Sequence, residues 1–235
     1  MKKVPTTFYL QLPFHFDEHL LVKDLQSITS DWKAHHYWHN YEGEWSSIAL
    51  LSVNGDDHNI SVHQNLSHNL KQTKTFQKCS YLQQVLKSFK CPIVSVRLLR
   101  LTPGSIIKAH EDYQLGYEND NFRLHIPITT NSKVEFILND TSLPMKPGEC
   151  WYTNVNFTHS VANKGKSDRV HLVIDAERNA WSDELFFSLA PKKSFAIEDQ
   201  IPKEVLQMMI RELKNHNEPA SKKLLIEYER KLANC

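Results

Sequence analysis

The chain has 235 residues, with 28 Lys and Arg against 27 Asp and Glu, which gives a formal net charge of +1. This length is enough for one large domain, or for a domain with a helical extension, and for a core that needs no disulfides. A charge so close to zero argues against broad electrostatic attraction to nucleic acid or to an acidic membrane. We therefore expect neither as a partner.

The cysteine pattern and the hydropathy indicate a reduced, cytoplasmic protein. Cys79, Cys91, Cys150 and Cys235 show no CxxC pairing and no spacing typical of a zinc site. The amino-terminal segment has no apolar run of signal-peptide quality. No segment approaches the ~20 apolar residues that a membrane-spanning helix needs.

Residues 1–91 are expected to form a mixed α/β region that packs on the core. Residues 8–12 and 45–53 are typical of strands, and the second of these ends at an Asn-Gly turn. Residues 19–32 and 80–89 carry apolar residues at helical spacing.

Residues 92–190 are expected to form the core, as a series of short strands separated by turns. The predicted strands are 93–101, 105–110, 123–129, 134–138, 149–153, 160–163 and 169–175. Pro-Gly, Asn-Ser, Asn-Asp and Lys-Gly pairs lie between them, as turn residues do. This pattern favours a mainly β fold with flanking helices, built on a double-stranded β-helix, the cupin-like jelly roll.

Residues 191–235 are expected to form a helical tail. Pro202 and Pro219 each precede apolar residues at helical spacing, and proline is favoured in the first turn of a helix. Such stripes more often pack against a core or a partner than bind a cofactor. The tail is therefore also a candidate interface for a homo-oligomer.

Two histidines and one carboxylate in the middle of the chain indicate a metal site. His110 and Asp112 stand two apart in Lys-Ala-His-Glu-Asp, and His159 follows in Asn-Phe-Thr-His-Ser-Val. Because side chains alternate along a strand, His110 and Asp112 can share one face while Glu111 points away. This combination is the facial ligand set of non-haem Fe(II) oxygenases, which leaves coordination positions open.

Arg169 lies on the predicted strand after His159, in Asp-Arg-Val-His-Leu-Val-Ile-Asp. Arg169 and His171 alternate with apolar residues. These apolar residues would point either into a core between the two sheets or to an outer face that helices cover. An arginine inside a barrel needs an anion to offset its desolvation, and its fork matches a carboxylate. That anion is either bound 2-oxoglutarate or a local acid such as Asp168 or Asp175.

Other polar and aromatic residues are also candidates for the site. Arg123 and His125 share one face of another predicted strand, where a purely structural barrel would place apolar residues. Trp45 opens a strand and can form a wall of the substrate pocket or simply pack. Cys150 and Trp151 follow a Pro-Gly turn and are expected in the barrel core.

Residues 97–176 resemble the aspartyl/asparaginyl β-hydroxylase family of Fe(II)- and 2-oxoglutarate-dependent dioxygenases. The matching stretches, in chain order, are Leu-Thr-Pro-Gly-Ser-Ile-Ile-Lys-Ala-His-Glu-Asp, Arg-Leu-His-Ile-Pro-Ile, Pro-Gly-Glu-Cys-Trp-Tyr-Thr-Asn, His-Ser-Val-Ala-Asn-Lys-Gly and Asp-Arg-Val-His-Leu-Val-Ile-Asp. The resemblance implies that His110 and His159 bind iron and that Arg169 holds the distal carboxylate of 2-oxoglutarate. It places Arg123 and His125 near the metal-proximal carboxylate or the substrate.

The chain departs from the animal membrane-bound members of that family, which have a small residue where this chain has Asp112. It resembles instead the soluble bacterial members, which include the free-proline cis-4-hydroxylases. The family resemblance therefore does not fix the substrate.

The sequence thus predicts a hydroxylase that uses Fe(II) and 2-oxoglutarate, with succinate and carbon dioxide as co-products. The metal and catalytic residues would be His110, Asp112 and His159. The substrate would be an amino acid, either free or as an Asp/Asn-type residue in a short peptide, held by Arg123 and Trp45. Two alternatives stay open: a non-catalytic cupin-like module that binds a metal or small molecule, and a structural oligomer.

Overall fold

The computed structural model describes residues 6–35, 38–61, 70–195 and 203–214, together with seven positions of the tail, which are 221, 222, 224, 225, 228, 229 and 232. The chain divides into two compact units, Met1–Ala196 and Ile197–Cys235. Each unit is described by itself.

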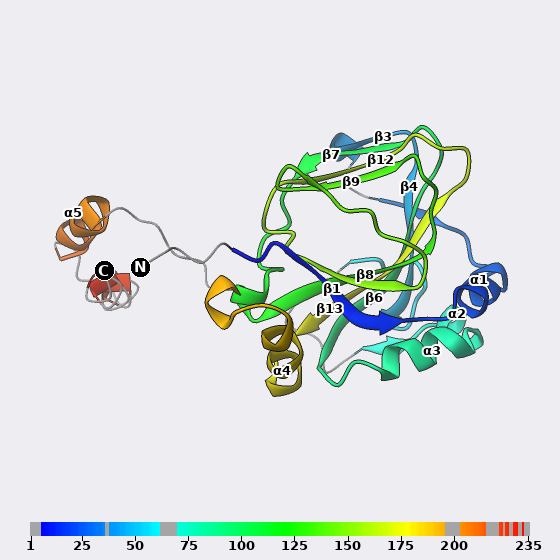
Figure 1. Cartoon of the computed structure of the whole chain (residues 1–235), viewed down its shortest axis with the longest axis horizontal. Coiled ribbons are helices and arrows are strands. Elements are labelled where there is room, and N and C mark those ends of the chain that lie inside the picture. Colours follow the sequence, from blue (N-terminus) through cyan, green and yellow to red (C-terminus); the bar gives the residue numbers. More distant parts are fainter. Residues whose placement is uncertain are drawn as a thin grey trace. The chain divides into compact units, whose positions relative to one another are not determined.

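Two antiparallel sheets form the first unit (Figure 1). The larger sheet has the order β1-β11-β8-β13-β6-β4-β2, with β5 paired to β4, and the smaller has the order β10-β9-β12-β7-β3. The strands of the larger sheet are β1 (Tyr9–His15), β2 (Lys33–Ala34), β4 (Trp45–Ser52), β5 (Lys71–Gln72), β6 (Ile93–Leu101), β8 (Asn121–Thr129), β11 (Glu149–Thr153) and β13 (Arg169–Glu177). Those of the smaller sheet are β3 (Tyr41–Glu42), β7 (Ile106–His110), β9 (Val134–Leu138), β10 (Thr141–Ser142) and β12 (His159–Asn163). Two facing antiparallel sheets with flanking helices confirm the predicted jelly-roll class.

Four α-helices of the first unit lie against the outer face of the larger sheet (Figure 1). They are α1 (Glu18–Gln26), α2 (Lys74–Lys78), α3 (Ser80–Lys87) and α4 (Ala180–Leu189). Short 3₁₀ turns η1 (Trp38–Asn40), η3 (Tyr117–Asn119) and η4 (Lys192–Phe195) join other elements. Side-chain capping fixes three of the helix starts: Asp17 accepts from the Leu20 amide at 3.0 Å, Thr73 accepts from the Phe76 amide at 3.2 Å, and Asn179 with Ser182 forms a capping box at α4.

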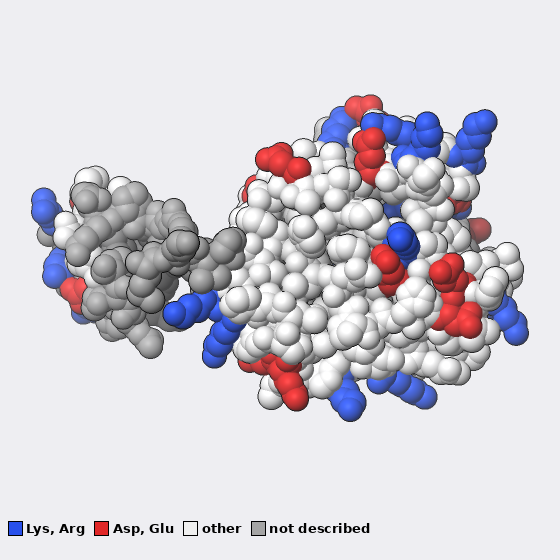
Figure 2. Space-filling view, in the orientation of Figure 1, with Lys and Arg blue, Asp and Glu red and all other residues white. Residues whose placement is uncertain are grey.

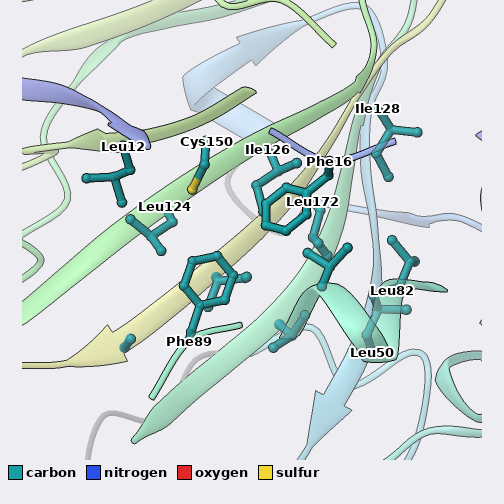
Figure 3. Close-up of a cluster of buried hydrophobic side chains, with 14 of the residues drawn as sticks. Leu12, Phe16, Leu50, Leu82, Phe89, Leu124, Ile126, Ile128, Cys150 and Leu172 are labelled. Carbon is teal, nitrogen blue, oxygen red and sulfur yellow. The ribbon is translucent and has the colours of Figure 1, made fainter. Parts of the chain in front are cut away.

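The main hydrophobic core lies between these helices and the larger sheet, not between the two sheets. Alternation along β13 turns Val170, Leu172 and Ile174 toward the helices, and β8 contributes its apolar residues in the same way. Figure 3 shows part of this cluster, in which Leu124, Ile126 and Leu172 from the strands approach Leu82 and Phe89. Burial of such side chains stabilises the fold by about 1.5–3 kcal/mol each.

The opposite face of the larger sheet turns toward the smaller sheet and encloses a second, smaller apolar cluster. It contains Trp45, Leu101, Ile107, Phe136, Leu138, Leu143, Met145, Trp151 and Val161. Seven further inward positions on β6, β8 and β13 are polar and buried, namely Ser95, Arg97, Arg123, His125, Arg169, His171 and Asp175. A barrel interior with this content is built for polar ligands rather than for stability alone.

Several expectations need correction. The segment before residue 92 does more than pack on the core, because β1 pairs with β11 and β4 pairs with β6 in the larger sheet. Cys150 was expected in the barrel core together with Trp151. It lies instead in the cluster under the helices, because neighbours on β11 point to opposite faces (Figure 3). Helix α1 ends at Gln26, short of the predicted residue 32, and α4 was not predicted.

Helix α5 (Lys203–Leu213) in the second unit confirms the helix predicted after Pro202. The helix predicted after Pro219 falls largely outside the described residues. Cys79, Cys91 and Cys150 are free thiols. None of the helices in the described parts of the chain is long and apolar enough to span a bilayer. On the face shown in Figure 2, basic and acidic side chains are scattered without a large patch of one sign.

Candidate active site

The two histidines predicted as ligands lie opposite each other on paired strands of the smaller sheet. In the pairing of β7 with β12, His110 is the partner of His159, and their ring centroids are 4.2 Å apart. Asp112 lies beside them, so that one ligand atom from each of the three residues falls within 4.8 Å of the others. Among the residues that the structure describes, no other group of His, Cys, Asp and Glu meets this criterion.

Backbone carbonyls fix the orientation of both imidazoles. Nδ1 of His110 lies 2.7 Å from the Lys108 carbonyl oxygen, and Nδ1 of His159 lies 3.1 Å from that of Phe157. A carbonyl can only accept, so each Nδ1 carries the proton and donates it. In the neutral form of such a ring the lone pair is on Nε2, which is the arrangement of metal-binding histidines.

Asp112 reaches the cluster from just beyond β7, not from within it. The strand ends at His110, and the Asp112 amide donates to the Val155 carbonyl at 2.8 Å. Strand alternation was therefore the wrong reason for choosing Asp112, although the structure does place it beside the histidines. Glu111 is exposed, and its carboxylate accepts a 2.9 Å hydrogen bond from the Thr158 hydroxyl.

Arg123 clamps the free side of the Asp112 carboxylate. Its Nη1 donates to Oδ2 of Asp112, while Oδ1 lies 3.9 Å from Nε2 of His110. Burial alone would raise the pKa of Asp112, but the charge and hydrogen bond of Arg123 together with the two histidines outweigh it, and the pKa lies below the ordinary value. Burial lowers the pKa of His159 to about 4. Asp112 is thus ionised and His159 neutral at neutral pH, which are the protonation states that a metal requires.

A second carboxylate links three strands of the larger sheet behind this cluster. Asp175 on β13 accepts from Arg123 Nε at 2.7 Å and from Arg97 Nη2 at 3.1 Å, and Ser95 donates to the same carboxylate at 2.8 Å. Burial alone would raise its pKa, but the charges of Arg123 and Arg97 lower it to about 2. Asp175 is therefore an anion that holds both arginines, and it is not available to Arg169.

Arg169 is buried on the interior face of β13, and among the residues that the structure describes it has no acidic partner. Its side chain is among the largest fully buried ones in the described chain, at 1% exposure, and its Nε has no hydrogen-bond partner. Burial lowers its pKa to about 9, so the guanidinium still carries its charge at neutral pH. A local acid does not neutralise Arg169, which removes one of the two explanations that the sequence left open.

Unpartnered polar atoms continue along the same interior face. Both ring nitrogens of His125 and Nε2 of His171 are buried without a partner. The two rings lie 5.7 Å apart in a T-shaped arrangement. Burial and the charge of Arg169 hold both pKa values well below that of a free histidine, so both rings are neutral. Buried polar groups without partners are rare in folded proteins, and these atoms could bind a polar ligand or water.

A cavity of about 460 Å³ opens onto the ligand cluster. Its polar wall includes Arg97, Arg123 and Asp112, and its apolar wall includes Trp45, Leu99 and Leu115. Trp45 is 8% exposed and stacks on His35 with 3.6 Å between centroids. The ring is therefore held rigidly at the edge of the cavity.

Sequence reasoning missed two components of this site. Arg97 was read as part of an ordinary strand, although the same alternation that singled out Arg123 also turns Arg97 inward. Asp175 was considered only as a partner of Arg169. The contacts of Asp175 with Arg97 and Arg123 depend on β13 lying between β6 and β8. This strand order cannot be predicted from a local sequence pattern.

The sequence profile of the aspartyl/asparaginyl β-hydroxylase family matches residues 17–179. The chain is 29% identical over 172 residues to L-proline cis-4-hydroxylase of Rhizobium meliloti (strain 1021), covering 72% of this chain and 60% of that protein. It is 25% identical over 136 residues to L-proline cis-3-hydroxylase 2 of a Streptomyces species, covering 57% of this chain and 47% of that protein. The chain thus spans about half to three-fifths of these relatives' lengths.

Among solved structures, an oxidoreductase of the 2OG-Fe(II) oxygenase family from Burkholderia pseudomallei has a similar fold. It matches with a TM-score of 0.51 and 13% identity, covering 73% of this chain and 86% of that chain. At this identity the likeness concerns the fold alone.

Proposed function

The chain belongs to the aspartyl/asparaginyl β-hydroxylase family, and from that premise we propose that it is an Fe(II)- and 2-oxoglutarate-dependent hydroxylase that acts on an amino acid. The observation that carries the proposal is the buried, uncompensated charge of Arg169 on the same barrel interior as the His110, Asp112 and His159 cluster. The cluster of His110, Asp112 and His159 can bind a metal, and Arg169 can bind an anion.

The donor set fits iron. Two neutral imidazole nitrogens and one carboxylate oxygen match the ligand preference of non-haem Fe(II), and three ligands leave open positions. Arg123 occupies Oδ2 of Asp112, so Oδ1 is the oxygen available to the metal. His110, Asp112 and His159 would therefore hold Fe(II).

The barrel interior fits 2-oxoglutarate. Arg169 would bind the distal carboxylate with its fork, and an anion there would relieve the cost of burying a guanidinium without a counter-charge. His125 lies between the Arg169 end and the metal cluster, with two unpartnered ring nitrogens. It would line the passage that the cosubstrate occupies.

The charges that remain favour a substrate with one carboxylate. With Fe(II) and the 2-oxoglutarate dianion in place, the cations of the site, which include Arg97, Arg123 and Arg169, exceed its anions by a single charge, since Asp175 and the partly exposed Asp112 are the acids that pair with these arginines. Arg97 lines the cavity and has an unpartnered Nε, so it would receive that carboxylate. Arg123, whose donors are engaged by two carboxylates, would act mainly by holding Asp112.

The body of the substrate would lie against the apolar wall. Trp45, Leu99 and Leu115 offer apolar contact opposite the arginines, which suits the carbon skeleton of an amino acid. L-proline hydroxylases are relatives of the chain, and a free amino acid is therefore the first substrate to test. An Asp- or Asn-containing peptide is the second.

When bound, iron and 2-oxoglutarate supply the oxidising chemistry that, with O₂, forms succinate and carbon dioxide and hydroxylates a C–H bond. The chain contributes placement. His110 and His159 are fixed by carbonyls and Asp112 by Arg123, and Arg97 would orient the substrate toward the cluster. Trp45 and Leu115 would exclude water from the reacting centre.

The test is a product screen with the purified protein, Fe(II), ascorbate and 2-oxoglutarate. Free amino acids and Asp- or Asn-containing peptides are offered separately, and a product heavier by one oxygen is measured together with succinate. An Asp112→Ala variant is the matched control. Metal binding without 2-oxoglutarate binding or turnover would overturn the proposal in favour of a non-catalytic binding module.

A further inference from the structure

Glu111 lines the cavity that opens onto the ligand cluster. Its neighbours in the chain are His110 and Asp112, and all three residues border this cavity. Among the described residues that line it, Glu111 and Asp112 are the acidic ones. Asp112 is already engaged, since Arg123 holds its Oδ2 and Oδ1 is the oxygen available to the metal. Glu111 is therefore the carboxylate of the cavity wall that remains for a ligand.

One hydrogen bond positions the Glu111 side chain and leaves half of its carboxylate free. The Thr158 hydroxyl donates to Oε1 at 2.9 Å. Thr158 directly precedes His159, so this bond joins the two segments of the chain that carry the histidine ligands. Within the described part of the chain, Oε2 accepts no hydrogen bond and Glu111 forms no ion pair. Oε2 is thus available to a cationic group in the cavity.

A chain of contacts separates the positive and the negative charge of the cavity wall. Nη2 of Arg97 and Nη2 of Arg123 lie 3.1 and 3.2 Å from Oδ2 of Asp175. Arg123 also donates to Asp112, and the next residue is Glu111. Arg97 lies at one end of this chain, and Glu111 follows its other end. Both ends line one cavity, which therefore offers a ligand a guanidinium and a carboxylate.

We infer that Glu111 recognises the α-ammonium group of a free amino acid whose carboxylate is held by Arg97. This inference rests on the proposed function and narrows its substrate class. A substrate carboxylate alone neutralises the single excess positive charge of the site. A free amino acid brings one more positive charge, which needs an anion of its own when it leaves water. In the interior of a peptide the same nitrogen is an uncharged amide, and it gains nothing from Glu111.

Two substitutions separate the charge of Glu111 from its hydrogen bond. Glu111→Gln removes the charge but retains a carbonyl oxygen that can accept from Thr158. Thr158→Val removes the hydrogen bond but retains the charge. Glu135→Gln is the matched control, because Glu135 is a partly exposed carboxylate on β9 that pairs with Lys164 and is not among the residues that line the cavity.

The probes are the common L-amino acids and analogues that have oxygen in place of the α-nitrogen. These analogues are the 2-hydroxy acids and, for proline, tetrahydrofuran-2-carboxylate, which retain the carboxylate and nearly the same size but lack the ammonium charge. The parent protein is first screened for hydroxylated product. Each amino acid that it accepts, and the oxygen analogue of that amino acid, is then titrated calorimetrically into the anaerobic protein loaded with Fe(II) and 2-oxoglutarate.

The parent should bind the amino acid more tightly than its oxygen analogue. Glu111→Gln should weaken binding of the amino acid by about three- to tenfold, as expected for a partly solvated ion pair, and should leave the analogue unchanged. Thr158→Val and Glu135→Gln should stay close to the parent for both ligands. Iron content and 2-oxoglutarate affinity are measured on the same preparations and should not change in Glu111→Gln.

Two titration results would overturn the inference. The first is parental affinity for the amino acid in Glu111→Gln. The second is an equal loss for the amino acid and its analogue, which would show a general disturbance of the cavity. Hydroxylation of Asp- or Asn-containing peptides with blocked N-termini, but of no free amino acid, would also overturn it while leaving the proposed hydroxylase in place. A parent that hydroxylates neither class would overturn the proposed function, and this inference with it.

Discussion

Arg123 donates from Nη1 to Oδ2 of Asp112, so the carboxylate proposed to bind iron is fixed by an arginine before any metal arrives. The same arginine is held from behind by Asp175, whose Oδ1 accepts from Nε at 2.7 Å. Residues from β8, β13 and the loop after β7 thus form one chain of charges that ends at the metal cluster. The larger sheet thereby orients a ligand that the smaller sheet carries.

The first prediction follows from this chain. Arg123→Met should weaken Fe(II) binding by about ten- to a hundredfold, as loss of a group that orients a metal ligand typically does. Sequence reasoning alone would leave the iron site of an Arg123 variant intact. Arg100→Met is the matched control, since Arg100 also lies on the larger sheet but is partly exposed and pairs with Glu44. Equal Fe(II) affinity in the two variants, measured by anaerobic titration, would contradict the prediction.

The second prediction concerns the ligands themselves. Replacing His110, Asp112 or His159 with Ala should empty the proposed iron site, because each would supply one of its three protein ligands. Glu111→Ala should retain bound iron, since its carboxylate is bonded to Thr158 at the rim. Iron content per protein after desalting is the readout. Loss of iron from the Glu111 variant but not from the Asp112 variant would mean that the carboxylate ligand has been misassigned.

The third prediction tests the anion site. Arg169→Lys retains a positive charge but loses the two-pronged geometry of the guanidinium. Affinity for 2-oxoglutarate should fall by about ten- to a hundredfold while iron stays bound. The dissociation constant and the iron content are measured on the same preparation. An unchanged 2-oxoglutarate titration would remove Arg169 from the site.

The strands of the core could be predicted because short stretches of sequence, through alternating polarity and flanking turn residues, are enough to define them. Alternation and turn residues reproduce β6, β9 and β11 to the residue, and β13 from its first residue. The two-sheet architecture follows from the number and spacing of such strands. Helix α4 was missed although Asn179 and Ser182 carry a capping signal, because its apolar residues do not form a clear stripe.

Only those features of the site that depend on a single strand or on the family resemblance could be predicted from the sequence. The grouping of His110, Asp112 and His159 could be anticipated from motifs. The bond from Arg123 to Asp112 could not, because it joins a strand of one sheet to a loop beyond the other. Arg97 was overlooked for a similar reason, since its importance depends on meeting Asp175 across two paired strands.

The fourth prediction uses acid stability. Asp175 has a pKa of about 2 in the folded protein against an ordinary value of 3.8. A lowered folded pKa means that its contribution is fully present above pH ~4 and is lost as the pH falls through about 2. Asp175→Asn should lower the free energy of unfolding at neutral pH by about 3–5 kcal/mol, because two buried arginines lose their anion.

The measurement is metal-free chemical denaturation of the parent and of the Asp175 variant between pH 7 and pH 2. The difference in the free energy of unfolding between the parent and the Asp175 variant should decrease below pH ~4, as the parent carboxylate becomes protonated. Asp31→Asn, at an exposed position, should follow the parent throughout. A difference in the free energy of unfolding that stays constant down to pH 2 would show that Asp175 does not stabilise the fold through its charge.

The fifth prediction concerns Arg97 and the substrate. Arg97 lines the cavity with a buried, unpartnered Nε, while its Nη2 is held by Asp175 at 3.1 Å. Arg97→Gln should raise the KM for a carboxylate-bearing amino acid by about ten- to a hundredfold. Iron content and 2-oxoglutarate affinity should stay near those of the parent, because Arg123 still holds Asp112. Succinate formed without hydroxylated product should increase, since the substrate is no longer held against the metal cluster.

Trp45→Leu is the comparison for this prediction, because it alters the cavity wall without touching the charge. It should raise KM less than Arg97→Gln does, since an apolar contact is replaced by a smaller one rather than lost. Product and succinate are measured together over a range of substrate concentrations in both variants. If the Arg97 variant retains the parental KM, or if a molecule without a carboxylate is hydroxylated equally well by both proteins, the carboxylate is not what this pocket recognises.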